Sequence, residues 1–212
     1  MTDSFWTLTL AGFLDRITAA SPTPAGGSVA AACATFGLGL VVMGLEVTRK
    51  RAGAEQTALL DPLLRSGREL IERLSAHADQ DAAAFKEHMA ARSLPKGTDE
   101  EKDLRRRRMQ ETLAAATESP LAAARDITAA LDLAVQTVDR CKPVVLSDVA
   151  AGVDLLAGSL TALLRTVGTN LPGLSETAQK ERLRGERVAL AASAAERLAA
   201  IHATIAVRTP GR

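Results

Sequence analysis

The chain has 212 residues, a formal net charge of +1, an apolar fraction of 47% and an aromatic fraction of only 2%. This length fits a single domain, which we expect to span residues 1–212. The near-neutral charge and the scarcity of aromatic side chains argue against nucleic-acid binding, which depends on a basic surface or on base stacking. Two cysteines cannot build a disulfide scaffold, so we expect a cytoplasmic protein.

The first half of the chain predicts three helices. The first begins after Thr9, a suitable N-cap, and ends near residue 20. A Pro/Gly/Ser loop at 21–28 follows, and we expect Ser28 to cap a second helix that continues to about residue 52. A third helix is predicted to start at Asp61 and Pro62, because aspartate is favoured at the N-cap and proline at the first helical position. It should end near residue 92.

The second half predicts three more helices after a turn at 94–97. Thr98 and Glu101 form a capping-box pattern that opens the fourth helix. We expect Pro120 to break or kink this helix before it resumes as far as about residue 140. Ser147 is predicted to cap a fifth helix that ends near residue 170. The last helix spans about 177–206.

The second and fifth helices carry few charges, and no segment has the alternation of a strand. We therefore predict an all-α, multihelical bundle with two buried central helices, which the other helices or a partner subunit cover. An alternative for the uncharged stretch from Ile17 to Leu45 is a membrane span, because a basic run follows it. Its first part is a Pro/Gly/Ser loop, so we favour a buried helix and expect no membrane association.

A carboxylate on the inward face of the third helix is the most informative polar group. Apolar residues and Asp81 recur at alternating spacings of three and four, through Ile71, Leu74, Ala78, Asp81 and Phe85. Burial of a carboxylate raises its pKa towards neutrality, which suits a general acid/base. The alternative is a structural ion pair with a neighbouring helix.

Two histidines lie on the same helix. His77 precedes Asp81 by one turn, and we interpret this spacing as a pair that adjusts the carboxylate. His88 lies about 16 Å along the helix from His77, too far for the two to share a metal ion. We therefore expect no metal site.

Two further segments have more than one interpretation. The Gly26, Gly27 and Ser28 segment opens the second helix, where its backbone N–H groups would face an anion or its small size would allow close backbone contact. The basic run 49–51 ends the same helix. It is either a solvated helix end or a clamp for a polyanionic ligand.

These segments also carry a resemblance to a known family. Residues 22–31 (PTPAGGSVAA) resemble the P-x-P-G-G-G-S-V-A-A segment of the cyclodeaminase domain of formiminotransferase-cyclodeaminase and of stand-alone methenyltetrahydrofolate cyclohydrolases. Residues 81–85 (DAAAF) are similar to the D-x-x-A-F element of that family. Further matches follow in order along the chain: Phe13-Leu14, Thr48, Arg51, Leu94-Pro95-Lys96, Pro120-Leu121, Ser147-Asp148 and Asn170-Leu171.

The resemblance implies a homodimer that acts on a one-carbon unit of tetrahydrofolate, as a formimidoyltetrahydrofolate cyclodeaminase or a methenyltetrahydrofolate cyclohydrolase. The folate would be the substrate, bound near the subunit interface, with no tightly bound cofactor. Asp81 would be the catalytic acid/base. The substrate-binding residues would be Gly26, Gly27, Ser28, Arg49, Lys50, Arg51, Ser147, Asp148 and Asn170.

Three positions depart from the family pattern. Ala25 replaces a loop glycine, and Lys142 and Thr166 replace asparagines. These changes support an alternative in which the chain is a non-catalytic folate-binding or helical interaction protein of the same descent.

Overall fold

A computed structural model describes residues 4–209, and in this range it confirms an all-α chain without strands. Residues 4–209 form six α-helices and three short 3-10 helices. In chain order the elements are η1 (Phe5–Thr7), α1 (Leu10–Thr18), α2 (Gly26–Arg49), α3 (Ala54–Arg92), α4 (Asp99–Arg140), η2 (Pro143–Val145), α5 (Leu146–Asn170), η3 (Leu171–Gly173) and α6 (Thr177–Arg208).

Two predicted helix caps are confirmed. The Thr9 side chain accepts a hydrogen bond of 3.0 Å from the backbone N–H of Gly12 at the start of α1. Thr98 and Glu101 form a complete capping box at the start of α4. Local side-chain chemistry therefore sets the start of both helices.

The predicted helix start at Pro62 is wrong, and Pro120 does not break its helix. α3 begins at Ala54 rather than at Asp61, and α4 is one continuous helix, so Pro62 and Pro120 both lie inside helices. Leu60, two residues before Pro62, and Leu121, directly after Pro120, are fully buried. Their burial favours a continuous helix and outweighs the backbone hydrogen bond that each proline removes.

Two predicted serine caps are also wrong. α2 begins at Gly26 with Ala25 at the N-cap, and the Ser28 hydroxyl donates to another helix instead. α5 begins at Leu146, before Ser147, because η2 leads directly into it. α2 also ends at Arg49, three residues earlier than predicted.

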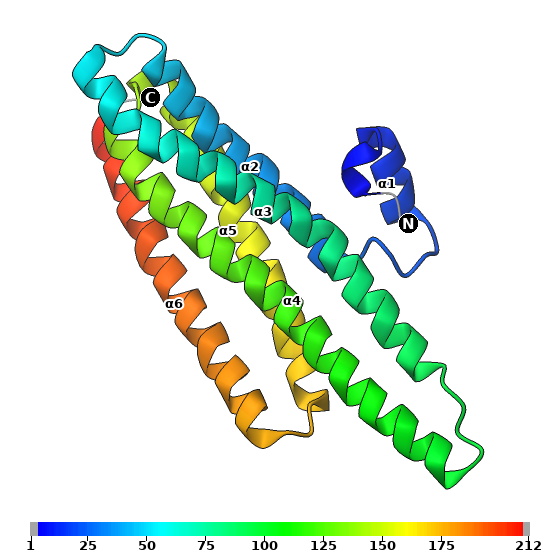
Figure 1. Cartoon of the computed structure of the whole chain (residues 1–212). Coiled ribbons are helices and arrows are strands. Elements are labelled where there is room, and N and C mark those ends of the chain that lie inside the picture. Colours follow the sequence, from blue (N-terminus) through cyan, green and yellow to red (C-terminus); the bar gives the residue numbers. More distant parts are fainter. Residues whose placement is uncertain (1–3, 210–212) are drawn as a thin grey trace.

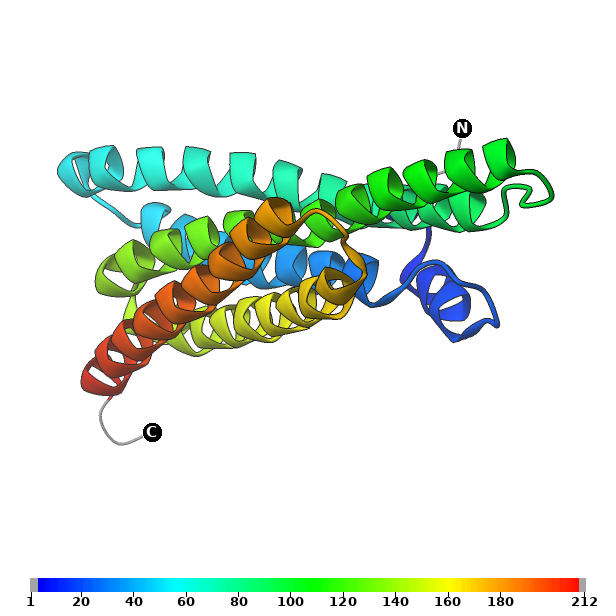
Figure 2. The same cartoon turned by 90° about the horizontal axis from the view of Figure 1, so that it is seen from below.

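α2 and α5 lie side by side in the centre of the bundle and run antiparallel (Figure 1). They are closest at Gly37 and Gly152, where a β-carbon on Gly37 would lie 2.6 Å from the carbonyl oxygen of Gly152. Only glycines allow the two backbones to touch in this way. The prediction of two central helices is confirmed, with α3 and α4 packed on one side and α6 on α4 and α5 (Figure 2).

Three helical segments are long and apolar enough to cross a membrane by length and composition, namely 26–49, 143–173 and 177–208. In the most apolar of them, α2, 67% of the apolar window is buried against the other helices. Packing within the bundle therefore accounts for most of the uncharged surface of α2.

Two parts of the chain project from the bundle (Figure 1). α1 stands apart from the central helices, and none of its residues is buried. The segment before it is fastened to α3, because Phe5 N–H donates to Asp79 at 2.9 Å and the Trp6 indole N–H donates to the Ser75 carbonyl at 2.8 Å. The hairpin of α3 and α4 extends beyond the first residue of α2.

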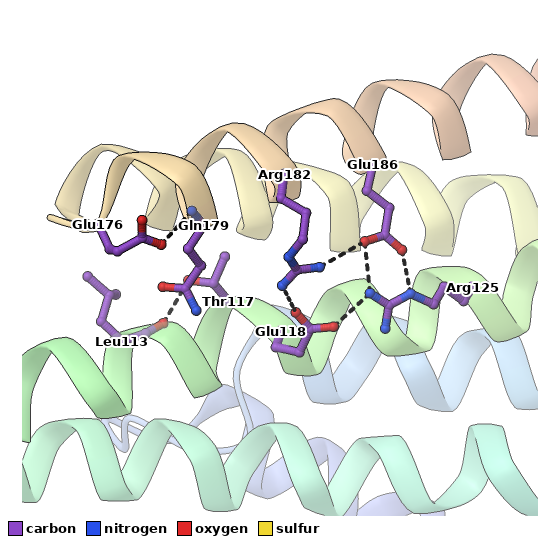
Figure 3. A network of polar contacts seen from close by, with 8 residues as sticks. All are labelled: Leu113, Thr117, Glu118, Arg125, Glu176, Gln179, Arg182 and Glu186. Carbon is purple, nitrogen blue, oxygen red and sulfur yellow. Dashed lines mark hydrogen bonds and ion pairs between the residues drawn. The ribbon is translucent and has the colours of Figure 1, made fainter.

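An ion-pair network joins α6 to α4 (Figure 3). Arg125 of α4 donates to Glu186 of α6 at 2.5 Å and to Glu118 at 2.7 Å, and Arg182 bridges the same two carboxylates. Hydrogen bonding to Arg125 lowers the pKa of Glu186. The network stabilises the docking of α6 while both carboxylates are ionised.

Candidate active site

The structure brings together Asp81 of α3 and the first turn of α2, as the sequence suggested. The Ser28 hydroxyl donates a hydrogen bond of 3.0 Å to Asp81 Oδ2, and Ser28 itself is fully buried. A β-carbon on Gly27 would lie 2.5 Å from Asp81 Cγ. The carboxylate therefore lies directly against the Gly27 backbone, in space that only a glycine leaves free.

The environment of Asp81 favours its protonated form. Burial raises the pKa of this carboxyl group, and hydrogen bonding from Ser28 opposes the rise only in part. Within residues 4–209, Asp81 makes no ion pair with a lysine, arginine or histidine. A carboxylate that is desolvated and lacks a cationic partner suits proton transfer near neutral pH.

The predicted pairing of His77 with Asp81 is wrong. His77 Nε2 lies 2.9 Å from Asp126 Oδ2 of α4, and Arg73 donates to the other oxygen of Asp126 at 3.0 Å. His77 points towards α4, whereas Asp81 points towards α2. The histidine therefore belongs to the contact between α3 and α4.

His88 also contacts α4, through a hydrogen bond of 3.1 Å between its Nδ1 and Thr112 Oγ1. Burial, with a smaller contribution from Arg92, lowers the pKa of His88. In the described part of the chain no three histidine, cysteine or acidic side chains come together as a metal site would require.

A groove of about 600 Å³ lies beside the first turn of α2. It is lined by α2, α5, the loop before α2 and Ile17 of α1, and it includes Gly26, Cys33, Leu155 and Ser159. Gly26 faces this groove, whereas Gly27 and Ser28 face Asp81, so the first turn of α2 contacts both. Most of the groove is apolar, which suits an aromatic ligand or an apolar partner surface.

A smaller cavity of about 110 Å³ lies on the α3 side of the same loop. Its lining includes Arg16 and Lys86, two cations that the sequence analysis did not single out. Each is isolated in the sequence, so no motif could have identified it. The fold brings them together from α1 and α3.

The predicted basic clamp lies far from Asp81 in the same chain. Gly27 and Arg49 are 22 residues apart in one helix, a distance of about 33 Å. Arg49 pairs with Asp61 at 2.5 Å, and Lys50 and Arg51 are exposed. Ser147 and Asp148 are exposed at this same end of the bundle.

Asn170 lies towards the Asp81 end of the bundle. Its side chain donates a hydrogen bond of 3.1 Å to the Ala116 carbonyl and so joins the end of α5 to α4. The ten predicted site residues therefore divide between the two ends of the bundle. Asp81, Gly26, Gly27, Ser28 and Asn170 lie towards one end, and Arg49, Lys50, Arg51, Ser147 and Asp148 lie at the other.

Two of the three departures from the family pattern have a visible structural setting. The backbone N–H of Lys142 donates to Thr48 Oγ1 at 3.0 Å, a contact that does not depend on the side chain of residue 142. Thr166 bonds only to the Ala162 carbonyl of its own helix. These substitutions are compatible with the fold.

Comparison with known proteins agrees with this architecture. Residues 9–189 match the family model described as formiminotransferase-cyclodeaminase. A methenyltetrahydrofolate cyclohydrolase of Methylorubrum extorquens is 35% identical over 178 residues, which cover 83% of this chain and 86% of that protein. A formimidoyltransferase-cyclodeaminase of Sus scrofa is 32% identical over 174 residues, 81% of this chain but only 32% of that longer protein.

A solved structure supports the fold independently. The crystal structure of a formiminotetrahydrofolate cyclodeaminase from Thermotoga maritima superposes with a TM-score of 0.83 at 21% identity, and the match covers 93% of this chain and 96% of that one. The helical bundle, the position of Asp81 against Gly27 and the match over residues 9–189 agree with one another. The chain belongs to the formiminotransferase-cyclodeaminase family.

Proposed function

We propose that this protein is a folate one-carbon enzyme that acts at the carbon bridging N5 and N10 of tetrahydrofolate. The observation that carries the proposal is the Asp81 carboxylate, which is desolvated, has no cationic partner in the described residues and lies against Gly27 and Ser28. The similarity to the cyclohydrolase of Methylorubrum extorquens, which covers most of both chains, supports the same conclusion.

In the cyclohydrolase reaction, water attacks the cationic methenyl carbon. Ionised Asp81 would accept a proton from the attacking water, and its negative charge would stabilise the cation before attack. Asp81 would then return the proton to N5 as the carbon–N5 bond breaks. The remaining hydroxyl proton leaves to solvent, and a formyl group stays on N10.

In the cyclodeaminase reaction, N10 attacks the formimino carbon on N5. The formimino nitrogen is protonated before the attack, and Asp81 would take the proton from N10 and pass it to the resulting amino group, so that ammonia leaves and the cationic methenyl bridge forms. The similarity to formimidoyltransferase-cyclodeaminases favours this second candidate. One carboxylate serves both reactions, because both pass through the methenyl state.

The folate is a substrate in both reactions, and we propose no tightly bound cofactor. We also propose a cytoplasmic homodimer without membrane association. Purification without detergent, followed by sedimentation, tests these two points. A chain that remains in the membrane fraction would contradict the cytoplasmic location, and a monomer in sedimentation would contradict the homodimer.

The decisive experiment is an absorbance assay of the methenyl chromophore with two substrates. Loss of absorbance from 5,10-methenyltetrahydrofolate indicates the cyclohydrolase, and gain of absorbance from 5-formiminotetrahydrofolate indicates the cyclodeaminase. If the protein binds both folates but converts neither, the non-catalytic alternative is correct.

A further inference from the structure

The part of α3 that follows Asp81 has a face that α2 does not cover. Asp81 lies against Gly27 in the first turn of α2, and α3 continues from there past the start of α2 (Figure 1). Phe85 and His88 follow Asp81 at spacings of four and three, so the three side chains share one face of the helix. Phe85 and His88 are both partly exposed. This face therefore presents a carboxylate, an aromatic ring and an imidazole in a row.

The hydrogen bonds of His88 determine which of its ring nitrogens carries the proton. His88 Nδ1 lies 3.1 Å from Thr112 Oγ1 of α4. The Thr112 hydroxyl donates its one proton to the Arg108 carbonyl at 2.8 Å, so Thr112 Oγ1 accepts from the imidazole. Nδ1 therefore carries the proton of the neutral ring, and Nε2 is left as a hydrogen-bond acceptor. Burial lowers the pKa of His88, which keeps the ring neutral at neutral pH.

The same hydrogen bond fixes the register between the antiparallel helices α3 and α4. His88 lies opposite Thr112. Asp81, seven residues before His88, is therefore level with Ser119, seven residues after Thr112 and on the same face of α4. The Ser119 hydroxyl is buried and has no hydrogen-bond partner among the described residues. Buried hydroxyl groups are nearly always hydrogen-bonded, so the partner of Ser119 comes from outside this part of the chain.

We propose that His88 accepts a hydrogen bond from the 2-amino group of a pterin ring that lies along α3 between Asp81 and His88. His88 would then be the residue that selects pterin substrates. The inference rests on the proposed function, which places N5 of the folate at Asp81. The 2-amino group is at the opposite end of the pterin ring from N5, and Phe85 offers an apolar ring face between the two ends.

The spacing along α3 and the chemistry of the imidazole both fit this ligand. Asp81 and His88 are about 10.5 Å apart along the helix axis. A pterin ring with one hydrogen bond at each end spans about the same length. The 2-amino group donates hydrogen bonds and accepts none, so its partner must be an acceptor, which Nε2 of neutral His88 provides. Thr112 is a positioning residue, because it holds the proton on Nδ1.

Calorimetric titration with two ligands tests the role of His88. The probes are 5-formyltetrahydrofolate and its 2-desamino-2-methyl analogue, in which a methyl group replaces the amino group. Wild type should bind the amino compound about tenfold more tightly, and His88→Leu should lose this preference. His88→Gln keeps an acceptor and should retain part of the preference. His202→Leu, on the exposed side of α6, is the matched control and should retain all of it.

Thr112→Val tests the positioning role. Without the Thr112 hydroxyl, the proton on Nδ1 loses its acceptor and can move to Nε2, so the preference for the amino compound should fall although His88 is still present. The nitrogen chemical shifts of the imidazole should report the change of tautomer, and the chain has only three histidines to assign. A purely structural role of Thr112 would lower the Tm and leave the tautomer and the preference unchanged.

The outcomes separate this inference from the proposed function. An unchanged preference in His88→Leu would overturn the role of His88, and the proposed function would stand if wild type still converts a folate. A wild type that binds neither compound and converts neither folate would refute the proposed function itself. If His88→Leu does not fold, the preferences of His88→Gln and Thr112→Val decide, and a full preference in Thr112→Val would overturn the inference.

Discussion

The carboxylate of Asp81 fills the space in which a side chain on Gly27 would have to lie, with Asp81 Cγ only 2.5 Å from the position of that β-carbon. The two residues come from different helices, α2 and α3, and they define the candidate site. We expect Gly27→Ala to displace the carboxylate, and a displacement on the order of 1 Å costs about 10²-fold in rate. Measured kcat/KM should fall by about this factor.

The matched control for Gly27→Ala is Gly185→Ala on the exposed side of α6. A β-carbon there meets nothing within 4 Å, so the change should raise stability by about 0.5–1 kcal/mol and leave kcat/KM unchanged. If Gly27→Ala behaves like Gly185→Ala, the carboxylate is not positioned by this contact.

Asp81→Asn should lower kcat by about 10²–10⁴-fold while ligand affinity changes much less. The asparagine oxygen still accepts the hydrogen bond from Ser28, but the group no longer transfers a proton. Single-turnover kinetics and a separate binding titration distinguish the two effects. Unchanged kcat would remove Asp81 from the chemistry.

The same variant should be more stable than the wild type at neutral pH. Burial raises the pKa of Asp81 in the folded state, so ionisation of this group destabilises the fold. This loss of folding stability is absent below the unfolded pKa of about 3.9, and it grows as pH rises through the raised pKa of the folded state. The Tm difference between Asp81→Asn and wild type should therefore vanish in acid and be positive at pH 7. A lower Tm for the variant at pH 7 would show that the carboxylate is stabilising.

Thr48 provides a test of buried hydrogen bonding. Its side chain is fully buried and accepts a 3.0 Å bond from the Lys142 N–H. Thr48→Val leaves this N–H without its acceptor, which should cost about 1–3 kcal/mol in denaturant titrations. Thr35→Val is the control, because Thr35 bonds only to the Ala31 carbonyl of its own helix. Equal losses for the two variants would contradict the role of Thr48.

The ion-pair network between α4 and α6 should make the free energy of unfolding depend on pH in the acidic range. Arg125 lowers the pKa of Glu186 in the folded state. The stabilisation that Glu186 gives the fold is therefore present above the unfolded pKa of about 4.3, and it is lost as pH falls through the lower folded pKa. These side chains are partly exposed, so we expect about 1 kcal/mol or less for Glu186→Gln. This corresponds to a Tm that is lower by about 2–4 °C at pH 7, and the difference should shrink as pH falls through the lowered pKa of Glu186 in the folded state. A pH-independent difference would point to packing instead.

The sequence predicted the helices and the position of Asp81 because both depend on local periodicity. It failed at His77, because the i, i+4 spacing to Asp81 cannot reveal that Asp126 on another helix lies 2.9 Å away. It failed at Pro62 because burial of Leu60, a tertiary effect, continues the helix through the proline. The distance between Gly27 and Arg49 could have been predicted from the sequence, because both lie on one predicted helix and its rise per residue fixes the distance.

The projecting hairpin of α3 and α4 gives the molecule a gradient of local stability. From Asp81 to Arg92, α3 runs about 17 Å towards the hairpin tip, beyond the first residue of α2. Amide hydrogen exchange should therefore be slowest in α2 and become faster towards the tip, as the free energy of local opening decreases. Asp81 lies at the boundary between the slowly exchanging core and the faster-exchanging hairpin. A folate bound at this boundary would slow amide hydrogen exchange in the hairpin more than in the core. Hydrogen exchange would therefore detect folate binding without the absorbance of the methenyl group.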